Sequence, residues 1–210
     1  MRQRRTVSKT VGLIVLLALA GCQRSPVGEP PKATVAPEPA SPEEKAEVLE
    51  QNVADGSKMA PAVTELIKKP EAQSVDPTGR EPLDDALTCL ARTIYWEARG
   101  EAGESMESVA NVVMNRLGDD RFPKTVCDVV KQGQEKGACQ FSWWCDGRSD
   151  SAFEDDPYAT AKEVARKALN QQLIDRTDGA LYFHHRGVAP GWSTRYVKTS
   201  EIGDFEFYKP

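Results

Sequence analysis

The sequence predicts a mainly helical α+β domain over residues 83–210, preceded by a segment of a different character. Two observations predict the class: apolar residues recur at helical spacing through much of this range, and the last forty residues lose that spacing and alternate near the end. A third observation sets the boundary, since ten of the fourteen prolines lie at or before Pro82. We therefore divide the chain into residues 1–21, 22–82 and 83–210.

The first helix of the domain is expected over residues 83–99. Leu87, Leu90 and Ile94 form its apolar stripe, and Gly100 suits the position just past a helix end. A second helix is expected from Ser105, as N-cap, to Leu117.

Two further helices and two extended segments complete the expected domain. Residues 125–132 predict a short helix, and residues 156–172 predict a longer one that begins with Asp156 as N-cap and Pro157 in its first turn. Residues 180–184 and 205–208 are expected to be extended, with a turn at Asp178 and Gly179.

The first 21 residues are typical of an export signal. A basic start precedes a short apolar run, and Leu19-Ala20-Gly21-Cys22 follows it, a pattern similar to a bacterial lipobox. In such proteins the cysteine becomes the lipidated first residue, so Cys22 is expected to anchor the chain to a membrane. An ordinary signal peptide that contains Cys22 by chance is the alternative. Gln23 after the cysteine favours, by resemblance, the outer membrane and its periplasmic face.

Residues 22–82 are expected to form a tether. The stretch 25–42 is rich in proline and has no aromatic residue, as in an extended linker, whereas residues 43–69 predict one or two short helices in a spacer. The whole chain has a net charge of −5, and the mature chain is near −9 because residues 1–21 carry four basic and no acidic side chains. This acidity argues against a nucleic-acid partner.

Four cysteines remain in the domain: Cys89, Cys127, Cys139 and Cys145. An even number in an exported chain favours disulfides, and three pairings are possible. We expect Cys127 to pair with Cys139 in a local loop, and Cys89 with Cys145. A zinc site is the competing interpretation, but no CxxC spacing supports it.

Glu97 is the candidate catalytic residue. It follows two aromatics, Tyr95 and Trp96, near the end of the first predicted helix. Desolvation and the negative end of the helix dipole both favour the neutral form of such a carboxyl group, which can then act as a general acid. The alternative is an ordinary surface glutamate.

An ordered series of motifs resembles the SleB-type cell-wall hydrolase family, whose namesakes are spore cortex-lytic enzymes, over residues 87–208. The matching stretches are residues 95–101, 109–116, 122–127, 139–143, 179–184 and 202–208. The resemblance implies a lysozyme-like domain acting on peptidoglycan glycan strands, with Glu97 as the catalytic acid. Glu101 and Glu104 match less central positions. Phe205 stands where the family often has a histidine.

The number of acids decides the expected reaction. Glycosidases usually use two carboxyl groups, and we find one with an apolar setting. A single acid suffices for a lytic transglycosylase that cuts the bond between N-acetylmuramic acid and N-acetylglucosamine. A muramidase-type hydrolase is the first alternative, and a catalytically silent peptidoglycan-binding lipoprotein is the second.

A sugar-binding groove needs aromatic faces and polar side chains. The candidates are Tyr95, Trp96, Asn115, Gln140, Ser142, Trp143 and Tyr182, with Trp144 and Trp192 as further aromatics. Core packing is the alternative for each aromatic, and loop or helix-end contacts are the alternative for the polar residues. The two histidines, His184 and His185, lie outside any HExxH motif, so we expect no metal and no cofactor.

Overall fold

The structure is a computed structural model that describes residues 39–57 and 59–210. The helices in this part of the chain are α1 (Pro42–Ala54), α2 (Lys69–Ser74), α3 (Ala86–Ala98), α4 (Gly103–Leu117), α5 (Val126–Lys131) and α6 (Asp155–Leu169). The strands are β1 (Tyr182–His185), β2 (Val197–Ile202) and β3 (Phe205–Lys209), and short 3₁₀ turns lie at residues 134–136, 142–144 and 193–195. The predicted mainly helical α+β class is confirmed.

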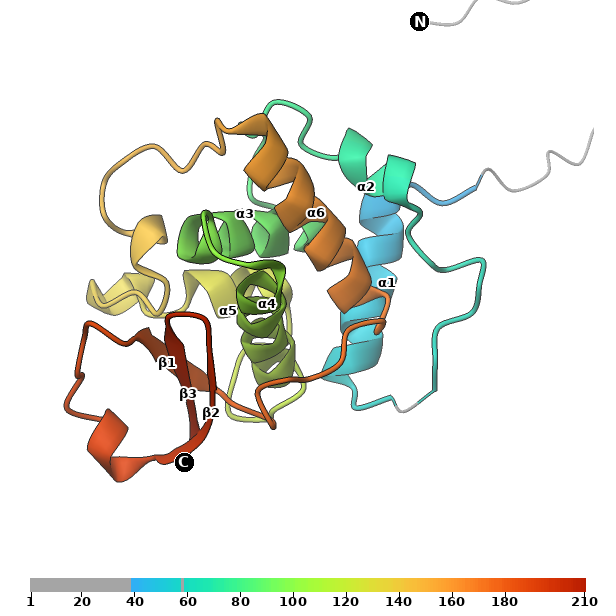
Figure 1. Ribbon diagram of the computed structural model, residues 1–210. Coiled ribbons are helices and arrows are strands. Elements are labelled where there is room, and N and C mark those ends of the chain that lie inside the picture. Colours follow the sequence, from blue (N-terminus) through green and yellow to red (C-terminus); the bar gives the residue numbers. More distant parts are fainter. Residues whose placement is uncertain (1–38, 58) are drawn as a thin grey trace, which may run out of the picture. The chain divides into compact units, whose positions relative to one another are not determined.

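Helix α3 is the centre of the helical layer (Figure 1). The Asp85 side chain caps it by accepting a 2.8 Å hydrogen bond from the Thr88 backbone. Leu87, Leu90 and Ile94 are fully buried, and α3 packs against α4, α5 and α6. The chain leaves α3 through Gly100, whose φ of +89° is in the left-handed region that glycine adopts without strain. The last turn of α3, which carries Glu97, is thereby held inside the molecule.

Two predicted helix starts are wrong. Helix α4 begins at Gly103, so Ser105 lies within its first turn, where its side chain is buried and caps nothing. Helix α6 begins at Asp155 after Glu154, one residue before the predicted N-cap Asp156. Neither helix has a side-chain cap at its start. A prediction that relies on capping residues therefore misplaces both starts.

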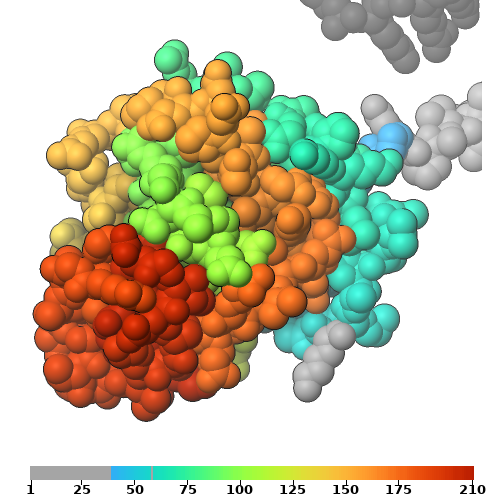
Figure 2. Space-filling model, viewed as in Figure 1, coloured from blue at the N-terminus to red at the C-terminus, as the bar shows by residue number. Residues whose placement is uncertain are grey.

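The C-terminal strands form an antiparallel sheet in the order β1-β3-β2. β3 lies in the middle, and its Phe205 and Phe207 are buried against Phe183 of β1. In Figure 1 the sheet lies at one end of the helical group and α1 lies at the other. Figure 2 shows the surface of the segment around residue 100 (green) directly beside that of the C-terminal strands (red).

The compact unit begins at Pro39, well before the predicted boundary at Leu83. Of the one or two short helices expected within residues 43–69, α1 is present, whereas α2 begins only at Lys69, and both helices pack on the domain. Leu49 of α1 is fully buried, and Glu50 accepts a 2.7 Å hydrogen bond from the Val126 backbone at the start of α5. Lys45 pairs with Glu71 at 2.9 Å, which joins α1 to α2.

A buried ion pair ties the segment before α3 to the core. Asp76 receives the Arg92 guanidinium at 2.6 Å and the Tyr158 hydroxyl. Burial alone would raise the pKa of Asp76, but these hydrogen bonds and one from the Glu81 backbone hold it below its usual value. Residues near 76 are therefore part of the fold rather than of a tether.

The predicted disulfide pairing is wrong, although all four domain cysteines are paired. Cys89 of α3 pairs with Cys127 of α5, with their Cα atoms 5.3 Å apart, and Cys139 pairs with Cys145 across a short loop, with their Cα atoms 6.0 Å apart. The packing of α5 on α3 brings Cys127 to Cys89 and leaves the 139–145 loop to close on itself.

The predicted signal segment, the lipidation site Cys22 and the proline-rich stretch up to residue 38 lie outside the described residues. Among the described residues, no helix combines the length and apolar character needed to cross a bilayer.

Candidate active site

A pocket of about 270 Å³ opens between the end of α3, the helix α4, the 139–145 loop and the sheet. It is lined by Glu97, Arg116, Gln140, Ser142, Tyr182, Phe183, His184, His185, Trp192 and Phe205. Glu97 is the one carboxylic acid in this lining. The predicted acid and three predicted substrate-binding residues, Gln140, Ser142 and Tyr182, therefore meet in one place.

Glu97 lines this pocket and is partly buried. Burial raises its pKa from 4.5 to about 7, while the positive charge of Arg116 acts in the opposite direction. A carboxyl group with this pKa is half protonated near neutral pH, so it can donate a proton and also accept one back.

Arg116 of α4 is a buried cation next to this acid. Its Nε donates a 2.8 Å hydrogen bond to the Leu181 carbonyl, and its guanidinium lies 5.2–5.5 Å from the ring centres of Phe122, Phe141 and Tyr182. Burial lowers the pKa of Arg116 to about 10, which still leaves it charged at neutral pH. Its Nη1 is buried without a hydrogen-bond partner in the part of the chain that the structure describes. The site thus holds a fixed positive charge that favours the ionised form of Glu97.

Aromatic rings form one wall of the pocket. The ring centres of Tyr182 and Tyr196 lie 4.8 Å apart, and those of Tyr182 and Trp192 lie 5.7 Å apart. Trp192 also meets His184 edge to face. Flat aromatic faces beside an acid suit the binding of sugar rings.

The 139–145 loop supplies polar groups to the opposite wall. Gln140 is held by a 3.0 Å backbone hydrogen bond to the Gln132 carbonyl, and Phe141, fully buried, fixes the loop to the core. The side chains of Gln140 and Ser142 border the pocket and form no hydrogen bond with other described residues. Both are free to bind a polar ligand.

Tyr95 and Trp96 are not brought into the pocket. Tyr95 is fully buried, and its hydroxyl accepts a 3.0 Å hydrogen bond from Arg99. Trp96 donates from Nε1 to the Asp150 carbonyl at 3.1 Å, and Arg99 covers its ring. Both side chains fix the 150–154 loop to α3, so the aromatics next to Glu97 in sequence are not those that surround it.

Asn115 and Trp143 also stabilise the fold and do not line the pocket. Asn115 donates to the Ala180 carbonyl at 3.1 Å and to Asp175 at 3.2 Å, which holds the turn before β1. Trp143 is buried in the core. Its neighbour Trp144 donates a 2.9 Å hydrogen bond to Gln134 and packs against Lys131, away from the pocket.

Sequence reasoning missed five of the lining residues: Arg116, Phe183, His184, His185 and Phe205. Arg116 lies in the last turn of the predicted second helix. An arginine there ordinarily interacts with the negative end of the helix dipole, so it does not indicate a site. The histidines were considered only as metal ligands. Their place at the end of the extended segment that follows the predicted turn, or just after it, was the one available signal.

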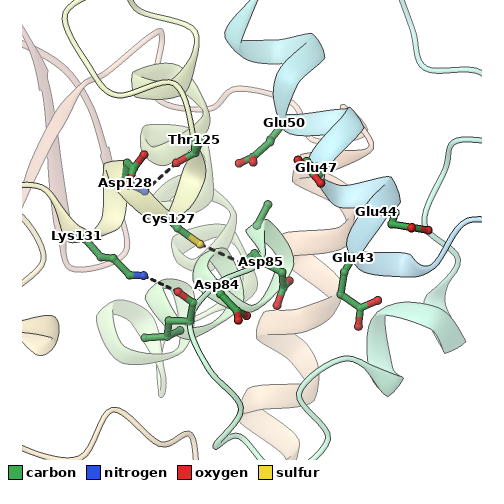
Figure 3. Close-up of a pocket in the computed structure, with 12 residues that line it drawn as sticks. Glu43, Glu44, Glu47, Glu50, Asp84, Asp85, Thr125, Cys127, Asp128 and Lys131 are labelled. Carbon is green, nitrogen blue, oxygen red and sulfur yellow. Dashed lines mark hydrogen bonds between the residues drawn. The ribbon is translucent and has the colours of Figure 1, made fainter. Parts of the chain in front are cut away.

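A larger pocket lies elsewhere in the domain. It measures about 480 Å³ and lies between α1, the start of α3 and α5 (Figure 3). Its lining includes Glu43, Glu44, Glu47, Glu50, Asp84, Asp85 and Asp128, with Lys131 as the one cation. It has no polar side chain left buried without a partner, so we assign the candidate active site to the smaller pocket that contains Glu97.

Comparisons with known proteins bear on the same part of the chain. The sequence profile of the Cell Wall Hydrolase family matches residues 100–208, just over half of the chain, and begins shortly after Glu97. The spore cortex-lytic enzyme of Oceanobacillus iheyensis is 31% identical over 124 residues, which cover 59% of this chain and 41% of that enzyme. The spore cortex-lytic enzyme of Bacillus subtilis is 30% identical over 115 residues, 53% of this chain and 34% of that enzyme. The matched region thus spans less than half the length of these relatives.

Among solved structures, the catalytic domain of the Bacillus cereus SleB protein is 28% identical, with a TM-score of 0.49, over 59% of this chain and 89% of that chain. The match over residues 100–208 includes all of the pocket lining except Glu97 itself. The chain belongs to the cell wall hydrolase family.

Proposed function

We propose that this chain is a lytic transglycosylase that cuts the bond between N-acetylmuramic acid and N-acetylglucosamine in peptidoglycan. The observation that carries the proposal is Glu97, the one carboxyl group that lines the pocket, with a pKa of about 7. Family membership and the names of the relatives, spore cortex-lytic enzymes, support peptidoglycan as the substrate.

The reaction needs one acid twice. Protonated Glu97 donates its proton to the glycosidic oxygen, and the C–O bond to the muramic acid anomeric carbon breaks. The N-acetyl group stabilises the positive charge that develops at that carbon. Ionised Glu97, next to the Arg116 cation, then takes the proton of the sugar's own 6-hydroxyl as that oxygen bonds to the anomeric carbon. The products are a 1,6-anhydro end and a free 4-hydroxyl, and Glu97 is protonated again.

The pocket walls have roles in this scheme. Tyr182 and Trp192 offer faces to the sugar rings, and Gln140 and Ser142 offer hydrogen bonds to N-acetyl amides and hydroxyls. A muramidase-type hydrolase is the second candidate, because the pocket is open and a water molecule in place of the 6-hydroxyl would give a reducing end instead. A silent peptidoglycan-binding protein is the third.

The proposed location rests on the N-terminal sequence. The basic start, the apolar run and the Leu19–Cys22 motif support lipidation at Cys22, and Gln23 supports the outer membrane. A lipid anchor there would hold the domain within reach of the peptidoglycan layer.

The test of the function is release of soluble fragments from purified peptidoglycan. The wild-type chain is expected to release fragments, and Glu97→Gln is expected to lose at least about 10³-fold in rate, because the amide cannot donate the required proton. Glu104→Gln, which removes an exposed carboxylate from the start of α4, is the matched control and should retain wild-type activity. Equal rates for the wild type and Glu97→Gln would remove Glu97 from this role.

A further inference from the structure

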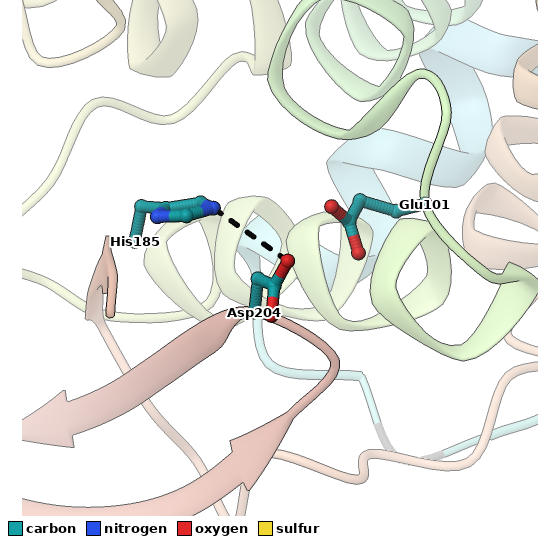
Figure 4. Close-up of side chains that lie close together, drawn as sticks. All are labelled: Glu101, His185 and Asp204. Atoms are coloured by element: carbon teal, nitrogen blue, oxygen red, sulfur yellow. Dashed lines mark ion pairs between the residues drawn. The ribbon is translucent and has the colours of Figure 1, made fainter. Parts of the chain in front are cut away.

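Three side chains from three separate segments meet at the edge of the active-site pocket. Glu101 follows α3, His185 ends β1, and Asp204 lies in the turn between β2 and β3. Each offers one ligand atom, and these atoms all lie within 4.8 Å of one another. Figure 4 shows the imidazole and both carboxylates directed toward a common point.

The turn that carries Asp204 is packed tightly against the helical layer. A Cβ at Gly203 would overlap the Ser105 hydroxyl and lie 3.2 Å from Glu101 Oε2, so only glycine permits this approach. The Ser105 hydroxyl is fully buried there and has no hydrogen-bond partner among residues 39–57 and 59–210. The turn that carries Asp204 thus lies directly against the side chains of Ser105 and Glu101.

The charges of this cluster are not balanced. Neither Glu101 nor Asp204 forms an ion pair with a lysine or arginine in the described residues, and Asp204 reaches only His185 Nε2, at 3.8 Å. Two carboxylates within a few ångströms repel one another. A bound cation between them would remove this repulsion.

We propose that Glu101, His185 and Asp204 form a binding site for a divalent first-row transition ion, with zinc as the best fit. One imidazole nitrogen and two carboxylate oxygens are ligands that zinc accepts, and three protein ligands leave a position for water. Calcium and magnesium favour oxygen-only ligand sets, so the histidine distinguishes this site from theirs. No local motif signals it, because the ligands lie far apart in the sequence.

Binding requires one rearrangement. The Gly187 backbone N–H donates a 3.2 Å hydrogen bond to His185 Nδ1, so the neutral ring carries its proton on Nε2, the atom nearer Asp204. A metal at Nε2 shifts that proton to Nδ1 and breaks the contact from Gly187. The contact lies in an exposed turn. A movement of this turn would take the Gly187 N–H away from the ring and leave the Nδ1–H free to find an acceptor.

The ion would connect the segment that follows Glu97 to the sheet that forms the opposite wall. Glu101 lies four residues after Glu97, and His185 itself lines the pocket. The site goes beyond glycan cleavage and does not rest on it, because metal binding is measurable without substrate.

The test is calorimetric titration of zinc into the metal-free full chain, with Cys22→Ser so that the chain is not lipidated and this residue supplies no thiol to the metal. The expected result is one saturable site, weakened at least tenfold by His185→Ala and by Asp204→Asn. Two matched controls, His184→Ala and Asp178→Asn, remove the other histidine and an exposed carboxylate and should leave zinc affinity within about twofold. In the amide spectrum, zinc should shift the Gly187 signal in the wild type but not in Asp204→Asn.

The exposed position of Asp204 makes Asp204→Asn a variant that keeps its fold, so its result is decisive even if a histidine variant is unstable. Absence of saturable zinc binding below about 1 mM, or equal affinity in the wild type and Asp204→Asn, would overturn the proposal. Tighter binding of calcium than of zinc would overturn the choice of metal.

Discussion

At the residue scale, the chemistry depends on how Glu97 is buried. The sequence predicts an acid with a raised pKa because Tyr95 and Trp96 precede it, and the pKa is indeed raised. The cause is different, since both aromatics contact the 150–154 loop and not the pocket. The groups that surround Glu97 come from α4, the 139–145 loop and the sheet. Adjacent residues of a helix point in different directions. Glu97 could therefore be predicted from the sequence as the acid, but the groups that surround it could not.

The raised pKa of Glu97 predicts a pH-dependent stability difference between the wild type and Glu97→Gln. Well below pH 4.5 the group is protonated in both folded and unfolded chains, so the stability difference between the two proteins should not depend on pH there. As pH rises from 4.5 to about 7, only the unfolded chain ionises, and the wild type loses up to about 3 kcal/mol relative to the Gln variant. Urea unfolding at pH 4, 6 and 8 measures this, and a difference that does not change with pH would contradict it.

Arg116 predicts a shift in the pH profile of activity. Its charge favours ionised Glu97, so Arg116→Met should raise the pKa of Glu97 and move the fall in activity to higher pH. Arg116→Lys keeps the charge and should leave the midpoint near that of the wild type, whatever its effect on stability. The profile of fragment release between pH 5 and 9 is the measurement. Identical midpoints for the Met and Lys variants would show that the charge does not act on Glu97.

At the element scale, the largest difference from the sequence prediction is the packing of α1 and α2. The proline content and the loose apolar spacing of residues 43–69 are typical of a spacer. This segment nevertheless buries a few side chains against the domain, such as Leu49 of α1 and Ile67, which precedes α2. A short helix that buries only one or two large residues per turn has too weak a pattern to reveal its packing.

The packing of α1 predicts that Leu49 contributes to global stability. Leu49→Ala should lower the free energy of unfolding by about 2–5 kcal/mol, because it leaves a cavity in the core. Val48, its half-exposed neighbour, provides the matched control, and Val48→Ala should change stability by no more than about 0.5 kcal/mol. Denaturant unfolding of the two variants compares them directly. Equal effects would mean that α1 is a spacer after all.

The sheet shows the same limit of prediction. The sequence predicts β1 and β3 because they contain aromatic or alternating residues. It does not predict β2, because four polar residues lie between Val197 and Ile202. β2 is an edge strand with one solvated face, so its pairing with β3 depends on backbone hydrogen bonds that composition does not show.

At the scale of the whole molecule, the site is assembled from segments far apart in the sequence. Glu97, Gln140, Ser142 and Tyr182 were predicted individually, and the fold brings them to one pocket. The disulfide pairing was not predictable, because cysteine spacing does not show that α5 packs on α3. The metal-site proposal has the same basis, since its three ligands meet only in the folded chain.

The central claim is that one carboxyl group performs both proton transfers. Mass spectrometry of the fragments that the chain releases from purified peptidoglycan tests it most directly. The claim predicts 1,6-anhydro-muramic acid ends with the wild type and no fragments with Glu97→Gln. Reducing ends in place of anhydro ends, or fragments released equally by the Gln variant, would contradict it.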